Sequence, residues 1–470
     1  MQPDEECRET KEQSVLKGKP VTRREFLKYA GMTGAAVAAS GTLGSLLAAC
    51  GKGTTGAAAG TTVATGAEPP LQDKFVIGGA RPLSGIYTMF EQAHFGPAYH
   101  MWVDEMNANG GIKIGGKKLP VELKVYDDES NLDNCTRLLT KLMEEDKVDW
   151  VLGPQSTAFL FAGAGIAQAH GYIMCSAEGG ATTLEQEMKK GQLPLFFQFL
   201  NYSNHYQVPM QVDVFKELGV KKVSIAYLDD LHGIEYNGQA QVFFPSAGIK
   251  ILSATPVPAG IKDVSSVINK WVQEKPDAVL SYQYPNESIL TLMTMIGMNY
   301  NPKAFVGGPG CATQAIYDIF KGKADGLMFE GAWTPAMSPK VLDYYNKLVA
   351  FVKDKANVDF WGPLIYRSEL QFIQQCIEKA GTTKMTAIAE VMRTAHFPTL
   401  MTDDMFMTNQ ILDRSCYAGQ LGQWQNGFPQ IIDPAPKRTA KEIWYPKPTW
   451  DEAATRSTTS TSLPMATTPT

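Results

Sequence analysis

Three strand-like runs between residues 75 and 157 constrain the fold of this chain more than any other feature. The runs span 75–77, 121–126 and 150–152, and each ends in small or polar residues just before a helical pattern. Strands that alternate with helices predict a parallel sheet. In such a sheet the strand ends, loop amides and helix N-termini meet at one edge, where ligands bind. We therefore expect an α/β fold with a ligand site at that edge.

A second series of strand-like runs follows the first. Its four runs span 223–227, 249–252, 278–281 and 304–307, and amphipathic helical patterns separate them. Each series can form its own parallel sheet. Two successive series therefore predict two Rossmann-like lobes with a cleft between them.

The pattern changes after Gly326. An apolar run at residues 327–331 is expected to be a strand that crosses back to the first lobe. Three helical stretches follow, at residues 339–354, 361–380 and 384–395. Asn426-Gly427 then separates two strand-like runs, which is the strongest short-range indication of a hairpin. We expect this last part to return to the second lobe.

The N-terminal segment has the features of an export signal. Arg23 and Arg24 precede a weakly apolar stretch at 29–47, as in twin-arginine signals. The sequence Leu-Ala-Ala-Cys that ends at Cys50 resembles a bacterial lipobox, in which the cysteine thiol carries a lipid. A buried cysteine after an ordinary signal is the alternative. Lipid on Cys50 would hold the protein at a membrane.

Charge and hydropathy narrow the possible partners. The chain has 43 Lys and Arg residues against 48 Asp and Glu residues, so it lacks the basic excess that nucleic-acid binding usually needs. No run of 18 uninterrupted apolar residues occurs, and we expect no permanent membrane span. A hydrophobic fraction of 44% is enough to form the cores of the two lobes.

Motifs for catalysis and for metal or cofactor binding are not found. Gly163-Ala164-Gly165 is followed by Gln168, where a dinucleotide-binding motif needs glycine or alanine. There is no Gly-x-Ser-x-Gly elbow and no His-Glu-x-x-His helix. The six histidines do not pair at metal-ligand spacing, and the cysteines contain no Cys-x-x-Cys. We expect no enzyme activity, no metal and no cofactor.

Four short motifs occur in an order and spacing that resemble one known family. They are Pro-Leu-Ser-Gly from Pro82, Asn-Gly-Gly-Ile from Asn109, Tyr-Asp-Asp from Tyr126 and Gly-Pro-Gln-Ser from Gly153. The chain is similar over residues 75–433 to type I periplasmic solute-binding proteins, in the branch that serves branched-chain amino acid and amide importers. The resemblance implies two lobes, three hinge crossings and a ligand cleft between the lobes.

Domain boundaries follow from the two series and from this resemblance. We expect a signal peptide at 1–49, a flexible tether at 50–72, lobe I at 73–199 and 326–403, lobe II at 200–325 and 404–445, and a disordered tail at 446–470. The hinge segments are expected near residues 199–202, 324–329 and 403–410.

The resemblance also implies ligand contacts from the strand-end loops of both lobes. Phe90 takes the position of an aromatic wall, and Thr157 takes that of a hydroxyl that binds a ligand carboxylate. Core packing is the alternative for Phe90, and a helix N-cap is the alternative for Thr157. The other expected contacts, each of which could instead be packed or solvated, are Ser84, Ser156, Ala177, Glu178, Gly179, Gly180, Tyr202 at the hinge exit, His232, Tyr282, Tyr284 and Gly310.

Cysteine pairing is left open by the sequence. The family that the chain resembles has a first-lobe disulfide, but Ser130 and Ser156 stand approximately at its two positions. That disulfide is therefore expected to be absent. Five cysteines remain outside the signal and the lipobox, so either at least one thiol is free or none of them pairs. These five are Cys135, Cys175, Cys311, Cys376 and Cys416.

Several departures from the family bear on the ligand. In the amino-acid binders a second-lobe carboxylate holds the ammonium group, and the matching residue here is Gly310. A threonine that binds the ligand carboxylate corresponds to Gly180, while Glu178 would repel that carboxylate unless it is protonated or turned away. An unpaired buried charge costs several kcal/mol. We expect a solute that is not a free branched-chain amino acid but offers hydrogen-bond donors, such as an amide, a urea-like group or an amine. A shifted register that brings Glu287 into reach is the alternative.

The sequence thus predicts an exported, lipid-anchored and monomeric solute-binding protein that faces the periplasm or the cell exterior. It would deliver a small polar or amphipathic solute, amino-acid-like or amide-type, to the permease of an ABC importer, and it would bind no nucleic acid. Two alternatives stay open. One is a receptor-type sensor, because fold alone does not decide function. The other is a twin-arginine-exported enzyme whose site carries no familiar motif.

Overall fold

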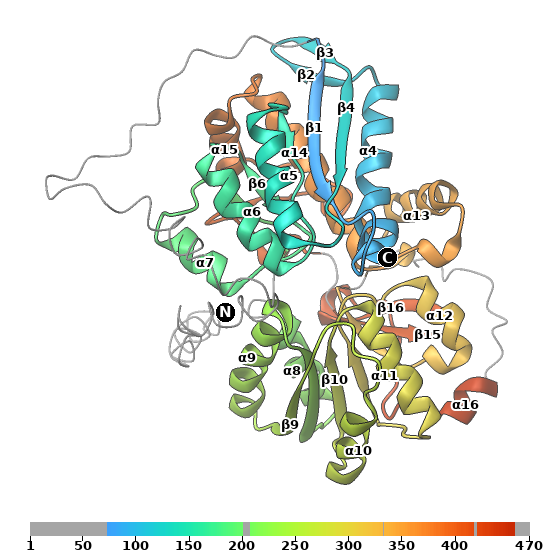
Figure 1. Ribbon diagram of the computed structural model, residues 1–470. Coiled ribbons are helices and arrows are strands. Elements are labelled where there is room, and N and C mark those ends of the chain that lie inside the picture. The colour runs from blue at the N-terminus through green and yellow to red at the C-terminus, as the bar shows by residue number, and fades with distance from the viewer. Residues whose placement is uncertain (1–72, 201–206, 332, 418–420, 456–470) are drawn as a thin grey trace, which may run out of the picture. The chain divides into compact units, whose positions relative to one another are not determined.

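The computed structural model describes residues 73–200, 207–331, 333–417 and 421–455, which form two α/β lobes (Figure 1). The expected signal peptide, the lipid site at Cys50, the tether and the predicted contact Tyr202 lie outside the described residues. The chain passes between the lobes three times. The expected fold class, two Rossmann-like lobes with parallel sheets, is confirmed.

The first lobe holds two groups of hydrogen-bonded strands and a small hairpin. Its strands are β1 (Phe75–Arg81), β2 (Ile112–Ile114), β3 (Lys117–Leu119), β4 (Val121–Asp127), β5 (Trp150–Val151), β6 (Met174–Ser176), β7 (Phe196–Gln198), β13 (Met407–Thr408) and β14 (Ile411–Leu412). In one group β1 pairs in parallel with both β4 and β5. In the other, β7 pairs in parallel with β6 and β14, and β13 lies antiparallel to β14.

The second lobe is built on one sheet of seven strands in the order β16-β15-β12-β11-β10-β8-β9. These strands are β8 (Lys222–Leu228), β9 (Lys250–Val257), β10 (Ala278–Tyr282), β11 (Phe305–Gly307), β12 (Met328–Glu330), β15 (Leu421–Gln425) and β16 (Phe428–Asp433). The five strands from β12 to β9 run parallel, and β15 and β16 form the antiparallel hairpin that Asn426-Gly427 predicts.

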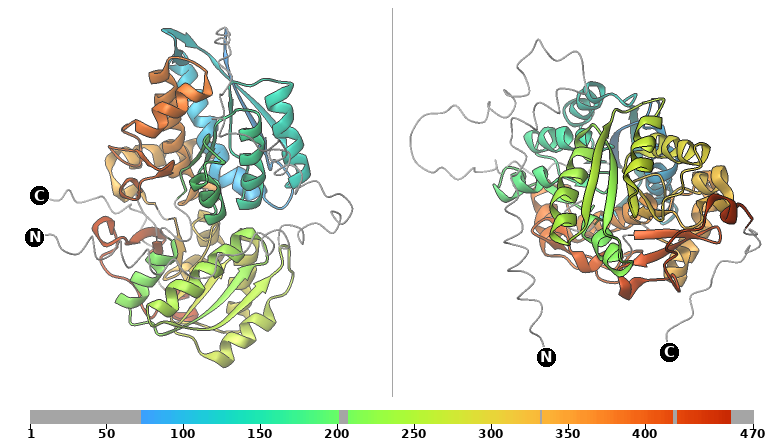
Figure 2. Two further views of the ribbon diagram at one scale, coloured as in Figure 1. Left: turned by 90° about the vertical axis from the view of Figure 1, so that its left-hand side faces the viewer. Right: turned by 90° about the horizontal axis from the view of Figure 1, so that it is seen from below.

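Helices cover the sheets of both lobes (Figure 2). In the first lobe they are the π-helix η1 (Phe90–Phe95), α4 (Gly96–Ala108), α5 (Leu132–Glu144), α6 (Thr157–Ala169), α7 (Thr182–Lys189), α13 (Pro339–Val352), α14 (Gly362–Ala380) and α15 (Met385–Thr394). In the second lobe they are α8 (Val208–Glu217), α9 (Leu231–Ser246), α10 (Ser265–Glu274), α11 (Pro285–Gly297), α12 (Gln314–Phe320) and α16 (Trp450–Thr455).

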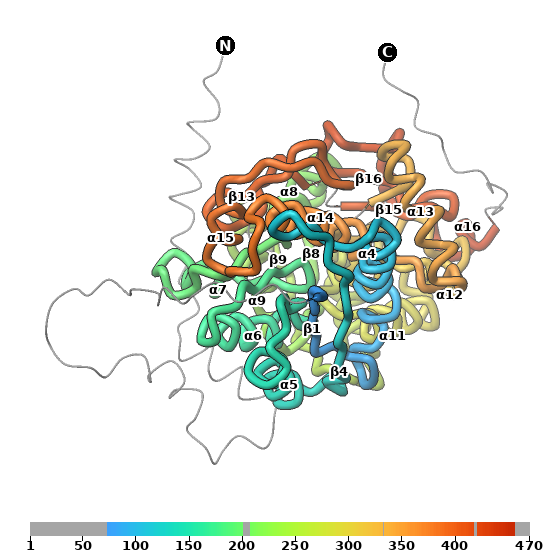
Figure 3. Tube along the Cα trace, turned by 90° about the horizontal axis from the view of Figure 1, so that it is seen from above, coloured from blue at the N-terminus to red at the C-terminus, as the bar shows by residue number. Residues whose placement is uncertain are grey.

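Alternation of side chains along β1 explains how this strand becomes central to the first lobe. Successive strand residues point to opposite faces. Phe75 and Ile77 belong to the apolar cluster that includes Trp102 of α4, whereas Val76 and Ala80 belong to the cluster of α5. Helices α4 and α5 therefore lie on opposite sides of β1 and β4 (Figure 3).

The apolar run at residues 327–331 forms strand β12. This strand was expected in the first lobe, but it lies in the sheet of the second lobe. Met328 pairs in parallel with Val306 of β11 and antiparallel with Gln423 of β15. Buried strands are apolar on both faces, so the run itself does not indicate to which sheet it belongs. The second crossing follows β12, later than the hinge expected at 324–329.

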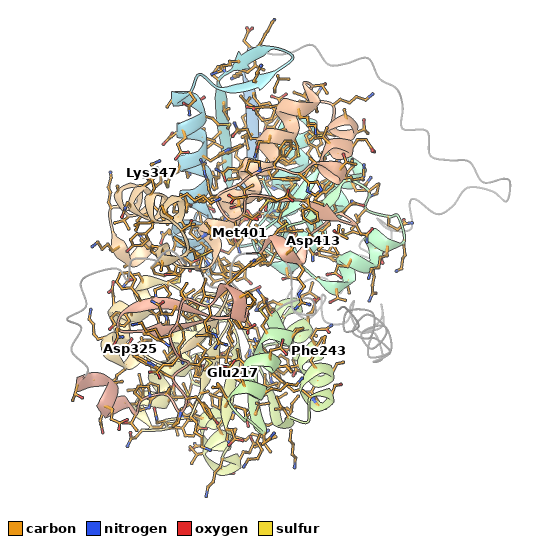
Figure 4. All side chains as sticks on the ribbon, turned by 180° about the vertical axis from the view of Figure 1, so that it is seen from behind. Glu217, Phe243, Asp325, Lys347, Met401 and Asp413 are labelled. Carbon is orange, nitrogen blue, oxygen red and sulfur yellow. The ribbon has the colours of Figure 1, made fainter. Side chains whose placement is uncertain are left out.

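The third crossing is also later in the chain than expected. A hinge was expected at 403–410, but Ile411 of β14 pairs with Gln198 of β7 in the first lobe. The chain reaches the second lobe only with β15. Figure 4 shows the same division, with Lys347, Met401 and Asp413 in the first lobe and Glu217, Phe243 and Asp325 in the second.

The segment that follows β16 is ordered further than expected. A disordered tail was expected from residue 446, yet α16 lies within it, and Trp450 is only 3% exposed. The indole Nε1 of Trp450 donates a hydrogen bond to the carbonyl oxygen of Tyr300 at 3.0 Å. The backbone N–H of Lys447 donates a hydrogen bond to the carbonyl oxygen of Lys303 at 2.7 Å. Burial of one large aromatic side chain and these bonds hold the segment on the second lobe.

The five cysteines outside the signal and lipobox are all buried and none is paired. Ser130, at one position of the family disulfide, accepts a hydrogen bond from the backbone N–H of Tyr87 at 3.0 Å and donates one to the carbonyl of Ser84 at 2.8 Å. Its hydroxyl therefore links the loop after β1 to the loop after β4. None of the described helices combines the length and the apolar character needed to cross a membrane.

Candidate ligand site

Loops that follow strands of both sheets line one cavity, which we call the inner cleft. Its lining residues are Phe90, Gln155, Ser156, Thr157, Glu178, Gly179, Leu200, His232, Tyr236, Tyr284, Pro309 and Trp361. The resemblance to the family implied seven of these twelve positions, which lie after β5, β6, β8 and β10 and in η1. The inner cleft is thus the meeting point of the two lobes' strand ends.

Aromatic side chains fill most of the inner cleft. The ring of Tyr284, from the second lobe, packs edge-to-face on Phe90 of the first lobe at 5.2 Å between ring centroids. The ring centroid of His232 lies 4.8 Å from that of Tyr284, and the ring centroid of Tyr236 lies 4.7 Å from that of His232. The remaining free volume is about 10 Å³, which is room for one water molecule. Phe90 therefore lines the inner cleft while its ring is packed against Tyr284.

The first-lobe side of the inner cleft is held by two loops in close contact. A β-carbon at Gly179 would come within 3.1 Å of the backbone of Ser156 and Thr157, so the close approach of the loop after β6 favours glycine there. Ser156 has a φ of 76°, in the left-handed region that side chains other than glycine rarely adopt. Thr157 begins α6, and the N-terminus of a helix favours an anion or a hydrogen-bond acceptor.

A larger space, which we call the outer groove, adjoins the inner cleft and shares Phe90 and Tyr284 with it. Its volume is about 280 Å³. The lining consists of residues 86, 87, 89 and 90 from the first lobe and residues 259–262, 284–287 and 290 from the second. Tyr87 of this lining packs edge-to-face on Tyr284, with 5.6 Å between the ring centroids.

Two carboxyl groups of the second lobe lie near the outer groove. Glu287 is 5% exposed and accepts a hydrogen bond from the backbone N–H of Gly260 at 2.7 Å. Burial raises the pKa of Asp230 to about 6, and the charge of Glu287 adds to this increase. Burial and the same two carboxylates raise the pKa of Tyr87 above its usual range. The part of the groove beside Tyr87 therefore has a negative potential.

Glu178 lines the inner cleft, and its carboxylate is paired with the buried guanidinium of Arg81. Its Oε1 lies 2.5 Å from Nη1 of Arg81, and both side chains are fully buried. Arg81 also donates through Nε to Glu91 at 2.9 Å and through Nη1 to the carbonyl of Gly153 at 2.6 Å. The Tyr99 hydroxyl donates to the other oxygen of Glu91 at 2.5 Å. Arg81 thus joins the end of β1, helix η1 and the loops after β5 and β6.

A second buried carboxyl group interacts with this arginine cluster. Burial raises the pKa of Glu178 to about 7, although the charge of Arg81 opposes the increase. Burial also raises the pKa of Glu369 on α14 well above its usual value, and the charge of Glu178 adds to this. Burial thus favours the protonated form of Glu369, whereas the charge of Arg81 favours the ionised form of Glu178.

The remaining predicted contacts among the described residues line neither cavity. Ser84 is at the surface, where its backbone N–H donates to Asp127 at 3.1 Å. Ala177 and Gly180 are buried in the first lobe. The Tyr282 hydroxyl donates to Gln211 at 2.7 Å in the second-lobe core. Gly310 has a φ of 93° and packs on Pro285, so no side chain is tolerated at this position.

Several residues of the inner cleft were not predicted, namely Gln155, Leu200, Tyr236, Pro309 and Trp361. Gln155 and Pro309 are direct neighbours of predicted positions, so extending the strand-end loops by one residue would have included them. Trp361 comes from the start of α14, far from any of the motifs. Nothing in the sequence shows that this segment returns to the cleft.

A direct bond also joins the lobes outside the two cavities. Glu235 of α9 accepts hydrogen bonds from both the backbone N–H and the hydroxyl of Thr182, each at 2.8 Å. Thr182 is the first residue of α7 in the first lobe, where a helix N-terminus attracts negative charge. The second-lobe carboxylate therefore caps a first-lobe helix.

Comparison with known proteins supports the family that the motifs suggest. Residues 74–427 match the family model described as periplasmic binding protein. The Leu/Ile/Val-binding protein homolog 8 of Brucella abortus is 26% identical over 305 residues, which cover 62% of this chain and 72% of that protein.

Solved structures share the fold. A branched-chain amino acid transporter substrate-binding protein from Streptococcus pneumoniae, in complex with isoleucine, has a TM-score of 0.61 at 19% identity and covers 72% of this chain and 98% of that chain. A solute-binding protein of an ABC transporter from Rhodopseudomonas palustris BisB5, in complex with 3,4-dihydroxybenzoic acid, has a TM-score of 0.65 at 16% identity and covers 80% and 99%.

The fold has two lobes, and residues after the strands of both lobes line one shared cleft, as in two-lobed binding proteins. This chain belongs to the periplasmic binding protein family. The resemblance seen in its four short motifs is thereby confirmed.

Proposed function

We propose that this chain is the solute-binding component of an ABC importer. It is exported, held at the cell membrane by lipid on Cys50, and faces the periplasm or the cell exterior. As a monomer it captures a small polar or amphipathic solute, presents it to the permease, and makes or breaks no bond in that solute. Closure of the two lobes by a hinge motion would bury the solute.

One observation carries this proposal: residues from both lobes line the same cavities, and Phe90 touches Tyr284 across them. A solute bound there contacts both lobes at once and so favours the closed arrangement. A permease can distinguish loaded from empty protein only through such a difference. The relatives named as Leu/Ile/Val-binding homologues and as ABC transporter proteins support the same function.

The function is tested by identifying what the protein carries. Protein purified from its native host is denatured, and the released small molecules are identified by mass spectrometry. We expect one compound in near-equimolar amount, which rebinds to refolded protein, raises its melting temperature and is recovered chemically unchanged. Conversion of that compound during incubation would instead indicate an enzyme.

Free leucine, isoleucine and valine are expected not to stabilise the protein. The positions that hold the ammonium group and the carboxylate in the amino-acid binders correspond to Gly310 and Gly180, which have no polar side chain and line neither cavity. The inner cleft itself has room for one water molecule. A ligand at 100 times its dissociation constant stabilises the native state by about 2.7 kcal/mol, which thermal unfolding detects easily. An increase of several degrees in melting temperature with millimolar leucine, isoleucine or valine would contradict this prediction.

Lipid attachment is expected to depend on Cys50 alone. Cells that express the wild-type chain and are fed a clickable fatty acid should yield a labelled protein, and Cys50→Ala should yield none. Cys135→Ala is the matched control, because Cys135 is fully buried in the first lobe and cannot be acylated in the folded protein. Equal labelling of wild type and Cys50→Ala would rule out the lipobox.

A further inference from the structure

The outer groove, and not the inner cleft, has the space for a solute. The inner cleft holds about 10 Å³, whereas the outer groove holds about 280 Å³. For scale, an engineered apolar cavity of about 150 Å³ binds benzene. The outer groove can therefore take a benzene-sized ring with a short substituent while the rings of Phe90 and Tyr284 stay in contact.

Apolar groups from both lobes form the walls of the groove. Ile86 and Met89 come from the first lobe, and Ile261 and Leu290 come from the second. Tyr87 and Tyr284 lie between them, with ring centroids 5.6 Å apart and ring planes at 86° to each other. This arrangement presents both ring faces and ring edges, and ring faces attract cations.

Negative charge lies near Tyr87 in the groove, because the carboxylates of Asp230 and Glu287 both act on this side chain. Glu287 lies in the first turn of α11 and lines the groove, and its neighbour Asp230 caps α9 through the backbone N–H of Gly233 at 2.9 Å. The interactions that shift the pKa of Asp230 come from burial, backbone N–H groups and other carboxylates, with no lysine or arginine among them. Within the lining of the groove, Lys262 is the only basic residue, and it is exposed to solvent.

We propose that the outer groove binds an organic monocation, namely an amine or a quaternary ammonium group on an aromatic or branched hydrocarbon body of about one ring. The inference rests on the proposed solute-binding function and specifies the solute class. The cation lies beside Glu287 and the ring of Tyr87, and the apolar body fills the space between the two lobes. A ligand carboxylate in the place of this cation would face Glu287 and Asp230. It would not reach the N-terminus of α6, because that helix end lines only the inner cleft.

The test uses four probes of one shape and different charge, measured by isothermal titration calorimetry at pH 7.5. They are phenethylamine, benzyltrimethylammonium, the neutral 2-phenylethanol and the anion 3-phenylpropionate. We expect the two cations to bind at least tenfold more tightly than the alcohol, and the anion to bind more weakly still. Equal affinity for cation and alcohol, or preference for the anion, would overturn the inference.

Two variants place the site in the groove. Glu287→Gln keeps an acceptor for the N–H of Gly260 and removes the charge, so it should reduce the affinity for cations at least tenfold. Asp229→Asn removes an equal charge from an exposed residue outside the groove lining and should have less than a twofold effect. Leu290→Trp should fill the groove and weaken all of the probes. An unchanged cation affinity in Glu287→Gln, with a native circular dichroism spectrum, would place the site elsewhere.

The outcome separates this inference from the broader function. If a co-purified solute rebinds to the protein but is an anion or a neutral polar compound, the groove inference is wrong and the solute-binding function stands. If neither the native solute nor any of the probes binds, the solute-binding function is wrong as well.

Discussion

Replacing Arg81 with methionine is expected to lower the free energy of unfolding by about 3–5 kcal/mol, the usual effect of removing one partner from a buried ion pair. Methionine keeps much of the length and volume of the side chain, so the change removes mainly charge and hydrogen bonds. Glu91 and Glu178 would lose their cation in a region without solvent access. Urea unfolding at pH 7 measures the difference.

Two comparisons make this prediction specific. Lys74→Met removes a lysine whose ion pair with Glu122 is about half exposed, and exposed pairs contribute about 0–1 kcal/mol. Adding Glu178→Gln to Arg81→Met should recover part of the lost stability, because one buried charge no longer needs a partner. If Arg81→Met is no less stable than Lys74→Met, the cluster does not stabilise the first lobe.

Replacing Glu330 with glutamine is expected to stabilise the protein by several kcal/mol at pH 8.5 and to have little effect at pH 5. Glu330 on β12 is buried and accepts a hydrogen bond from Nε2 of Gln211 at 2.6 Å. Burial raises its pKa to about 8, from a usual value of 4.5, and no basic residue is among the groups that oppose the shift. Each unit of pKa corresponds to about 1.4 kcal/mol.

The sign follows from linkage. Because the folded state holds the proton more tightly than the unfolded state, the stability that Glu330 contributes is fully present below pH 4.5 and is lost as pH rises through 8. His94 and His232 act oppositely, since burial lowers their pKa to about 3 and their contribution is lost as pH falls from about 6.5 towards 3. His94 and His232 contribute equally to the stability of the wild type and of Glu330→Gln. Their contributions therefore cancel when the free energy of unfolding of one protein is subtracted from that of the other.

Thermal unfolding from pH 5 to pH 8.5 measures that difference directly. The wild type should lose stability with rising pH faster than the Glu330→Gln variant does. Glu145→Gln, at an exposed position on the end of α5, should show no difference of this kind. A gap between wild type and Glu330→Gln that stays constant with pH would show that Glu330 does not bind a proton on folding.

The cleft was foreseeable from sequence because its chemistry lies at strand ends, which apolar runs followed by small residues mark clearly. The pattern marks only the edge, and the individual lining residues Thr157, His232 and Tyr284 came from the resemblance to the family. The arginine cluster was not foreseeable. Arg81 follows an apolar strand and precedes a turn, which is typical of a solvated residue. Its partner Glu178 lies 97 residues further along the chain, and only tertiary structure joins them.

The predicted boundaries of the two lobes were wrong at β12 and β14 for a related physical reason. Short buried strands such as β12 and β14 are specified by their hydrogen-bonding partners, and sequence alone does not identify these partners. The apolar run at β12 fitted either sheet equally well. Helices and hairpins, whose contacts are local, were placed correctly, as at Asn426-Gly427 between β15 and β16.

The late third crossing has a consequence for biosynthesis. Strand β12 receives its antiparallel partner β15 only after the ribosome has made α13, α14, α15 and the two short strands of the first lobe. At about 5–20 residues per second this interval lasts on the order of ten seconds, during which one edge of β12 stays unpaired and open to other chains. No continuous stretch of the gene encodes the second lobe without this insertion. A fragment that folds alone must join residues 207–331 directly to 421–455.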